Sequence, residues 1–313
     1  MKKLTTNNKY LSLILRIIVG GLFITSALLK YLSLDAFDLY IYEHQLFGFQ
    51  ITEILTRLLI AIEFSLGVML IVGLQLRLAK ISTILCLLLF TIYLILMPYI
   101  FSVDMSNCHC FGEKLPFTRN QSIIKNIILL ILTIPINTSL LVPNIKRKAL
   151  ILCVLALLAM GISFSINPPS FIYNKIYGQY VDIDENLYHI ALENTGKKEE
   201  FSNGKQIICL YSTACPYCQK SAQKIHLAIQ KEGLDQNNIK IIFWRTDNDK
   251  PMEKFFKTTR TTPLEYTTFT VDTFLNITNG QMPVILFTEN GEIKQSYQYI
   301  SIDEQKIKEF LVK

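Results

Sequence analysis

Two closely spaced cysteine pairs are the residues best suited to chemistry in this chain of 313 residues. Cys215 and Cys218 enclose the dipeptide Pro-Tyr, and Cys108 and Cys110 enclose His109. Since the cysteines number seven, an odd count, a simple framework of structural disulfides is not expected. The three remaining cysteines lie in apolar stretches, where a thiol behaves as a small hydrophobic group: Cys86, Cys153 and Cys209.

The Cys215/Cys218 pair predicts thiol–disulfide exchange. A helical pattern over 218–232 follows it, so Cys215 lies at a helix N-terminus, where unpaired amides and the helix dipole favour a thiolate. Cys215 is then the attacking thiol, and Cys218, one turn further on, is the resolving thiol that releases a mixed disulfide. The alternatives are a fixed disulfide or half of a zinc site, but no second CxxC or HxxxH motif supplies further zinc ligands.

The elements around this pair predict an α/β domain over 170–313. Buried strands are expected at 206–212, 239–244 and 284–288, and Asn290-Gly291 predicts a hairpin to a strand at 292–299. The region 250–280 is expected to be variable and helical, and Ser301 is expected to cap a C-terminal helix over 302–312.

This order of elements resembles the thioredoxin fold. The resemblance implies that Pro283 is the cis-proline opposite the CxxC pair, and that the backbone before it pairs with a cysteine-bearing client. Two positions depart from thioredoxin: Ala214 replaces an aromatic residue, and Cys209 replaces a buried acid. The resemblance therefore implies neither the thioredoxin proton path nor a strongly reducing potential.

The first half of the chain has the composition of a membrane domain. Residues 1–169 carry 14 Lys/Arg and 7 Asp/Glu, whereas residues 170–313 carry 17 and 18. A multi-domain protein is predicted, with a four-helix membrane domain over 1–145, a fifth span and linker over 146–169, and the α/β domain. Five apolar runs approach the ~20 residues that a span requires: 11–32, 51–74, 81–101, 123–142 and 149–166.

Basic residues in the short loops predict the topology. The clusters at 2–9, 77–80 and 146–148 are cytoplasmic by the positive-inside rule, so this charge is not a nucleic-acid footprint. We therefore expect an integral inner-membrane protein of five spans, with a cytoplasmic N-terminus and a periplasmic C-terminal domain. Both cysteine pairs then lie on the oxidising side of the membrane.

Few ionisable residues occur within the predicted spans. Glu63 lies near the middle of the second span, and Arg16 is the cation nearest to it in depth. We expect an Arg16–Glu63 packing pair, because an unpaired charge at this depth is costly. The alternative is a proton-relay or quinone-site role for Glu63. The other histidines outside the cysteine pair, His44, His189 and His226, have no partner motif.

The first four spans resemble the MauE/DoxX family over roughly residues 10–145. The matching positions are Arg16, Gly20, Lys30, Glu63, Gly67, Gly73, the CxCFG sequence at 108–112, and Asn126. The resemblance implies disulfide handling or maturation of periplasmic enzymes such as methylamine dehydrogenase, and, through DoxX relatives, a link to quinones. Arg16 and Glu63 are the candidate cofactor-binding residues.

Three interpretations of Cys108 and Cys110 stay open. The pair can be a redox relay with a strained disulfide, a structural loop staple, or, with His109, a site for copper(I) or zinc. The leading hypothesis is the relay, in which cysteine-containing clients react at Cys215 and the electrons pass between the two pairs. Dithiol exchange needs no cofactor, and the expected electron partner is a membrane quinone or another membrane donor or acceptor.

The rival hypotheses are a non-catalytic maturation or assembly factor and a CxC metal-delivery protein. The direction of electron flow, oxidase or reductase, is undetermined because both directions use the same residues.

Overall fold

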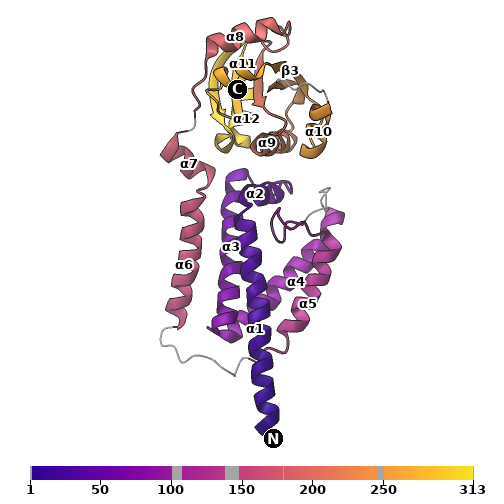
Figure 1. Ribbon diagram of the computed structural model, residues 1–313, viewed down its shortest axis with the longest axis vertical. Helices are drawn as coiled ribbons and strands as arrows, with labels where there is room; N and C mark the ends of the chain where they lie inside the picture. Colours follow the sequence, from indigo (N-terminus) through magenta and orange to yellow (C-terminus); the bar gives the residue numbers. More distant parts are fainter. Residues whose placement is uncertain (1, 101–107, 138–147, 179, 245–249, 313) are drawn as a thin grey trace. The chain divides into compact units, whose positions relative to one another are not determined.

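The computed structural model describes residues 2–100, 108–137, 148–178, 180–244 and 250–312. These form two compact units (Figure 1). The first unit comprises Met1–His44 and Ile51–Pro168, and the second comprises Gln45–Gln50 and Pro169–Lys313.

The first unit is helical. Its described elements are α1 (Lys2–Tyr31), α2 (Leu34–Tyr42), α3 (Phe49–Val72), α4 (Leu76–Ile100), α5 (Arg119–Thr133) and α6 (Lys148–Ile166). Three segments are long and apolar enough to cross a membrane: Lys9–Tyr31, Phe49–Val72 and Leu76–Ile100. A fourth results if the bent pair of α6 and α7 (Ser170–Tyr177) counts as one span. The described residues therefore give three to four spans, and the prediction of five is not confirmed.

Two glycines bring α1 and α3 into close contact. A Cβ atom on Gly20 would lie 2.7 Å from the carbonyl oxygen of Gly67, and one on Gly67 would lie 2.6 Å from that of Gly20. Any larger side chain would push the two backbones apart. Val19 and Leu70 pack beside this contact and are fully buried.

The predicted Arg16–Glu63 pair is wrong. The Nε atom of Arg16 donates to the carbonyl oxygen of Leu70 (2.9 Å), and its Nη2 atom donates to that of Ile71 (3.1 Å). Glu63 instead pairs with Lys30, whose Nζ lies 2.5 Å from Oε1. Arg16 thus supplies hydrogen bonds to two carbonyl groups in the last turn of α3, which lack partners within the helix.

The correction follows from how α2 packs on the first turns of α3. Arg57 of α3 lies 3.3 Å from a carboxylate oxygen of Asp38 in α2, and Thr56 donates to the same carboxylate. The first turns of α3 therefore lie level with α2 and not with α1. Counting residues from the two helix ends placed Glu63 too deep, at the level of Arg16.

The second unit is built on a five-stranded sheet of order β3-β2-β1-β4-β5. Strands β1, β2 and β3 are parallel, whereas β4 is antiparallel to both β1 and β5. The strand bounds are β1 (Lys205–Tyr211), β2 (Ile239–Trp244), β3 (Glu265–Phe269), β4 (Val284–Glu289) and β5 (Glu292–Gln298). The fold is consistent with the predicted thioredoxin-like domain.

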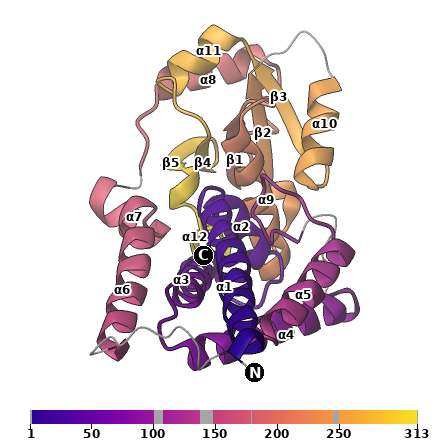
Figure 2. The same cartoon turned by 60° about the horizontal axis from the view of Figure 1, so that its bottom comes forward.

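Helices cover both faces of this sheet, and α8 and α11 lie side by side (Figures 1 and 2). Side chains alternate along β1, so Ile207 and Cys209 face α9 and α12, while Ile208 and Leu210 face α8 and α11. The helix bounds are α8 (Glu185–Asn194), α9 (Pro216–Glu232), α10 (Lys250–Thr259), α11 (Val271–Ile277) and α12 (Glu304–Val312).

Two local predictions fail in this unit. The region 250–280 contains β3 between its two helices, although it was expected to be helical. Helix α12 begins at Glu304, and Asp303 accepts a hydrogen bond from the amide of Lys306 (2.9 Å). Asp303 therefore caps this helix, whereas the expected cap, Ser301, lies in a preceding 3-10 turn.

Candidate redox sites

Cys215 is positioned by the turn between β1 and α9. Strand β1 ends at Tyr211, and Cys215 is the N-cap of α9, with Pro216 as the first helical residue. The Sγ atom of Cys215 accepts a hydrogen bond from the amide of Cys218 (3.3 Å). A proline suits this position because it has no amide hydrogen and its fixed φ matches a helix. The first turn therefore points its free amides at the Cys215 sulfur.

The two thiols of this pair differ strongly in acidity. The pKa of Cys215 is lowered to about 6, chiefly by a hydrogen bond from the Cys218 thiol and further by the amides of Cys218 and Tyr217. Burial raises the pKa of Cys218, whose side chain is fully buried. Cys215 is half-buried and Cys218 is not accessible, so the geometry makes Cys215 the attacking thiolate and Cys218 the protonated partner.

Pro283 lies at the same end of the sheet as this pair. The Met282–Pro283 peptide bond is cis, and the next residue, Val284, pairs with Leu210 near the end of β1. The chain before Pro283 and the turn that holds Cys215 thus lie at the same end of strands β1 and β4.

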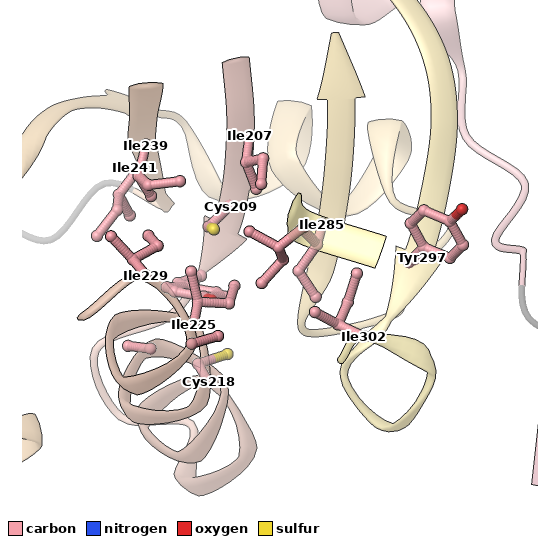
Figure 3. Close-up of a cluster of buried hydrophobic side chains, with 14 of the residues drawn as sticks. Ile207, Cys209, Cys218, Ile225, Ile229, Ile239, Ile241, Ile285, Tyr297 and Ile302 are labelled. Carbon is pink, nitrogen blue, oxygen red and sulfur yellow. The ribbon is translucent and has the colours of Figure 1, made fainter. Parts of the chain in front are cut away.

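Cys209 lies in the core beneath α9 (Figure 3). Burial raises its pKa to about 12, so it remains a neutral thiol at physiological pH. The hydroxyl of Tyr211, two residues further along β1, forms a hydrogen bond with Ser221 of α9 (2.8 Å). A neutral thiol thus occupies the place of the acid that thioredoxin has at this position.

Cys108 and Cys110 form a disulfide inside the first unit. Each is 2% exposed, and Phe111 and Leu94 pack around them. The hydroxyl of Ser122 lies 2.7 Å from the sulfur of Cys108 and 3.1 Å from that of Cys110. The pair is therefore sealed from solvent in this conformation, and an exchange partner can reach it only after a local opening.

A polar network connects this disulfide to the buried ion pair. Ser26 lies 2.7 Å from the carbonyl oxygen of Cys110 and 3.1 Å from Oε2 of Glu63, and Lys30 donates to Ser26 (3.2 Å). Glu63, one of the two candidate cofactor residues, thus lies near Cys110. The other, Arg16, lies at the opposite end of α3 and is not part of this network.

A small cavity of about 40 Å³ lies beside the network and is lined by Cys110, Cys86, Lys125 and Asn126, among others. By volume it holds two or three waters. The Nζ atom of Lys125 lies 4.8 Å from the ring centre of Phe111, and the side-chain oxygen of Asn126 is buried without a hydrogen-bond partner. The sequence reasoning missed Lys125, although a lysine within an apolar helix was a usable signal.

Comparisons with known proteins found matches to part of the chain and to nearly all of it. Residues 8–142 match the family model described as methylamine utilisation protein MauE. This match covers the described helices α1–α5 and the CxC sequence, so the predicted resemblance to MauE is confirmed. Over nearly the whole chain, Protein TlpB of Flavobacterium psychrophilum is 24% identical, covering 94% of this chain and 93% of the relative. No solved structure matches the chain.

Together, the apolar helices and these matches support a membrane protein with a role in membrane thiol–disulfide redox or maturation.

Proposed function

We propose that the protein is a membrane-bound thiol–disulfide oxidoreductase that reacts with extracytoplasmic client proteins at Cys215. The geometry of Cys215 carries this proposal, because a half-exposed sulfur at a helix N-terminus combines accessibility with a pKa of about 6. At pH 7 such a thiol is mostly thiolate, the nucleophilic form. The thiolate attacks a client disulfide, and Cys218 then displaces the client thiolate to close the Cys215–Cys218 disulfide. The same steps in reverse oxidise two client thiols, and this is the direction that delivers electrons to the membrane domain.

The Cys218→Ser variant tests this proposal. Without the resolving thiol, clients should remain joined to Cys215 as mixed disulfides, visible as high-mass bands on non-reducing gels of cells quenched in acid. The Cys215→Ser/Cys218→Ser double variant is the matched control and should trap nothing. If the single variant traps no client while the cells keep the function that depends on this protein, the oxidoreductase proposal fails.

We propose further that the Cys215/Cys218 pair exchanges with the Cys108–Cys110 disulfide. In this exchange one pair is oxidised from dithiol to disulfide while the other is reduced from disulfide to dithiol. Two electrons and two protons pass from the first pair to the second. The burial of Cys108 and Cys110 requires the 108–112 segment to open before reaction. Alkylation of cellular protein, with each thiol located by mass spectrometry, tests the exchange: Cys215→Ser must shift the redox state of Cys108 and Cys110, and an unchanged state contradicts it.

The membrane electron partner that we propose is a quinone, as the family resemblance implied. An outer groove of about 470 Å³ supports this site, because its lining includes Lys125, a hydrogen-bond donor that also lines the small cavity beside Cys110. The full chain in nanodiscs with reduced Cys108 and Cys110 should convert a quinone to its quinol, and Lys125→Met should slow this step.

Maturation of an extracytoplasmic enzyme is the second candidate function. The match of residues 8–142 to a family titled methylamine utilisation supports it. In this case the second unit holds a cysteine-containing client without turning it over. Purified full-length protein would then lack catalytic turnover with a dithiol peptide, and the Cys218→Ser variant would support client maturation as well as the unmodified chain does.

A further inference from the structure

One buried hydroxyl contacts both sulfurs of the Cys108–Cys110 disulfide. The Oγ atom of Ser122 lies 2.7 Å from the sulfur of Cys108 and 3.1 Å from that of Cys110. The sulfurs of a disulfide carry no hydrogen, so the Ser122 hydroxyl is the donor towards both of them. Ser122 lies in α5 and is fully buried, so water does not compete with the sulfurs for this hydroxyl.

A thiolate that forms at this place needs such a donor. Each cysteine is 2% exposed, and Leu94 and Phe111 pack around the pair. Burial among apolar groups disfavours a charged sulfur, because the sulfur loses its hydration. A hydrogen bond to the charged form offsets part of that cost, and hydrogen bonds to charged groups are stronger than those between neutral groups. Ser122 is placed to supply this bond to either sulfur.

The charged side chains that line the cavity beside Cys110 also favour a thiolate. Lys30 and Glu63 line it as an ion pair, so their charges balance. Lys125, three residues after Ser122 on α5, lines the same cavity. Among the described residues of this lining, Lys125 is therefore the cation without an opposite charge in the cavity, and its field attracts a negative charge on Cys110.

One hydroxyl can serve both sulfurs of the reduced pair. A hydroxyl donates one hydrogen bond and accepts others. When one sulfur is a thiolate and the other a thiol, Ser122 donates to the thiolate and accepts from the thiol. The hydroxyl then links the two sulfurs, in the same way that the Cys218 thiol donates directly to Cys215 in the other pair.

We propose that Ser122 is a catalytic residue of the Cys108–Cys110 pair, whose hydroxyl stabilises the thiolate that forms when the disulfide is reduced. The inference rests on the proposed redox cycling of this pair and adds the group that stabilises its reduced form.

The electrons and protons of the reduction balance. A reductant thiolate bonds to one sulfur, the Cys108–Cys110 bond breaks, and the other sulfur leaves with the electron pair and accepts from Ser122. The second thiol of the reductant then attacks the mixed disulfide, closes the reductant's own disulfide and expels the second sulfur of the pair. Its proton passes to one of the two expelled sulfurs, so the product is one thiol and one thiolate.

Ser33 offers a matched control, because it is a second buried hydroxyl at the same loop with a different partner. Its Oγ atom donates to the carbonyl oxygen of Leu29 (2.9 Å) and accepts from the amide of Glu113 (3.0 Å). Ser33 therefore bonds the backbone just after the cysteines, whereas Ser122 bonds the sulfurs themselves. Loss of the Ser33 hydroxyl should loosen the closed loop without removing a donor to sulfur.

The test uses the full-length protein in nanodiscs, in a Cys215→Ser/Cys218→Ser background that leaves Cys108–Cys110 as the measured pair. Dithiothreitol is the reductant, and alkylation with mass spectrometry measures the reduced fraction of Cys108 and Cys110. The rate of reduction and the equilibrium constant with dithiothreitol are both determined. The variants compared with the background are Ser122→Ala and Ser33→Ala.

We expect Ser122→Ala to slow reduction roughly 10-fold and to shift the equilibrium constant towards the disulfide by a similar factor, the low end for a lost hydrogen bond to a charged group. Ser33→Ala should speed reduction, because the loop opens more often, and should leave the equilibrium constant unchanged. The equilibrium constant decides, since the frequency of loop opening alters the rate but not the relative free energies of the two redox states. An unchanged equilibrium constant in Ser122→Ala overturns the proposal, and so does an equal shift in Ser33→Ala.

A failure of this inference is distinguishable from a failure of the proposed function. Client trapping at Cys215 and the dependence of the Cys108–Cys110 redox state on Cys215 are measured in cells, with Ser122 in place. If those results hold while Ser122→Ala leaves the equilibrium constant unchanged, only the role of Ser122 is wrong.

Discussion

The two cysteine pairs of this protein differ in their exposure to solvent and in their reactivity. Cys215 is half-buried at the start of α9, where backbone amides and a neighbouring thiol stabilise its thiolate. Cys108 and Cys110 are 2% exposed and joined in a disulfide that contacts Ser122. The first arrangement makes a sulfur reactive towards large partners, and the second withholds a disulfide from every partner until the loop opens.

This difference shows that the spacing of two cysteines does not determine their reactivity. At Cys215 the thiolate is stabilised by the neighbouring Cys218 thiol and by the backbone amides of a helix N-terminus. The polar groups around the CxC pair come from side chains on α1, α3 and α5. Its chemistry therefore depends on buried side chains, which single substitutions can remove.

The largest expected contrast is in accessibility. With iodoacetamide at pH 7, Cys215 of the reduced protein should react as an exposed thiolate, with a rate that rises with pH around a midpoint near 6. Reduction of the Cys108–Cys110 disulfide by a membrane-impermeant phosphine should be at least ~100-fold slower than that of an exposed disulfide, because opening costs a few kcal/mol. Comparable rates would show that the 108–112 segment is open in solution.

The buried ion pair beneath the CxC loop gives the next largest effect. Replacing Glu63 by Leu leaves Lys30 buried without its carboxylate and should lower the free energy of unfolding by about 3 kcal/mol. The Lys30→Met/Glu63→Leu double variant removes both charges and should regain most of that loss. Thermal unfolding of the detergent-solubilised protein measures both, and a double variant less stable than the single one would contradict the pairing.

Most strands and turns of the second unit could be predicted from the sequence. The strand patterns at 206–212, 239–244 and 284–288 and the Asn290-Gly291 turn gave elements whose bounds agree to within a residue or so, because apolar strands and tight turns are local signals. Strand β3, with the sequence EYTTF, was missed since its threonines gave no apolar pattern. It is paired along one edge only, to β2.

The polar contacts inside the first unit could not be predicted from the sequence in the same way. Glu63 pairs with Lys30 and not with Arg16, because the first turns of α3 pack against α2, and helix lengths alone do not reveal this offset. His44 and Tyr93 are 49 residues apart and belong to no motif, so only the tertiary structure brings them together. The depth of a charged residue within a predicted span indicates that it needs a partner, but it does not identify that partner.

The smallest expected effect separates the two sources of acidity at Cys215. The hydrogen bond from the Cys218 thiol is the largest cause of the lowered pKa, and the amides of the first turn contribute less. Cys218→Ala removes that donor and should raise the pH midpoint of Cys215 alkylation from about 6 towards the ordinary cysteine value, whereas Cys218→Ser keeps a hydroxyl donor and should stay near 6. Below its midpoint each variant should react slowly, because the thiol is protonated.

The rate at pH 7 should change only a few-fold in Cys218→Ala, since a thiolate of higher pKa is intrinsically more nucleophilic and offsets part of its lower population. The pH midpoint is therefore the decisive measurement, taken from the alkylation rate of Cys215 between pH 4 and 10. If Cys218→Ala keeps a midpoint near 6, the helix N-terminus alone sets the acidity. The contrast between the two cysteine pairs would then rest on backbone geometry, with no part for the neighbouring thiol.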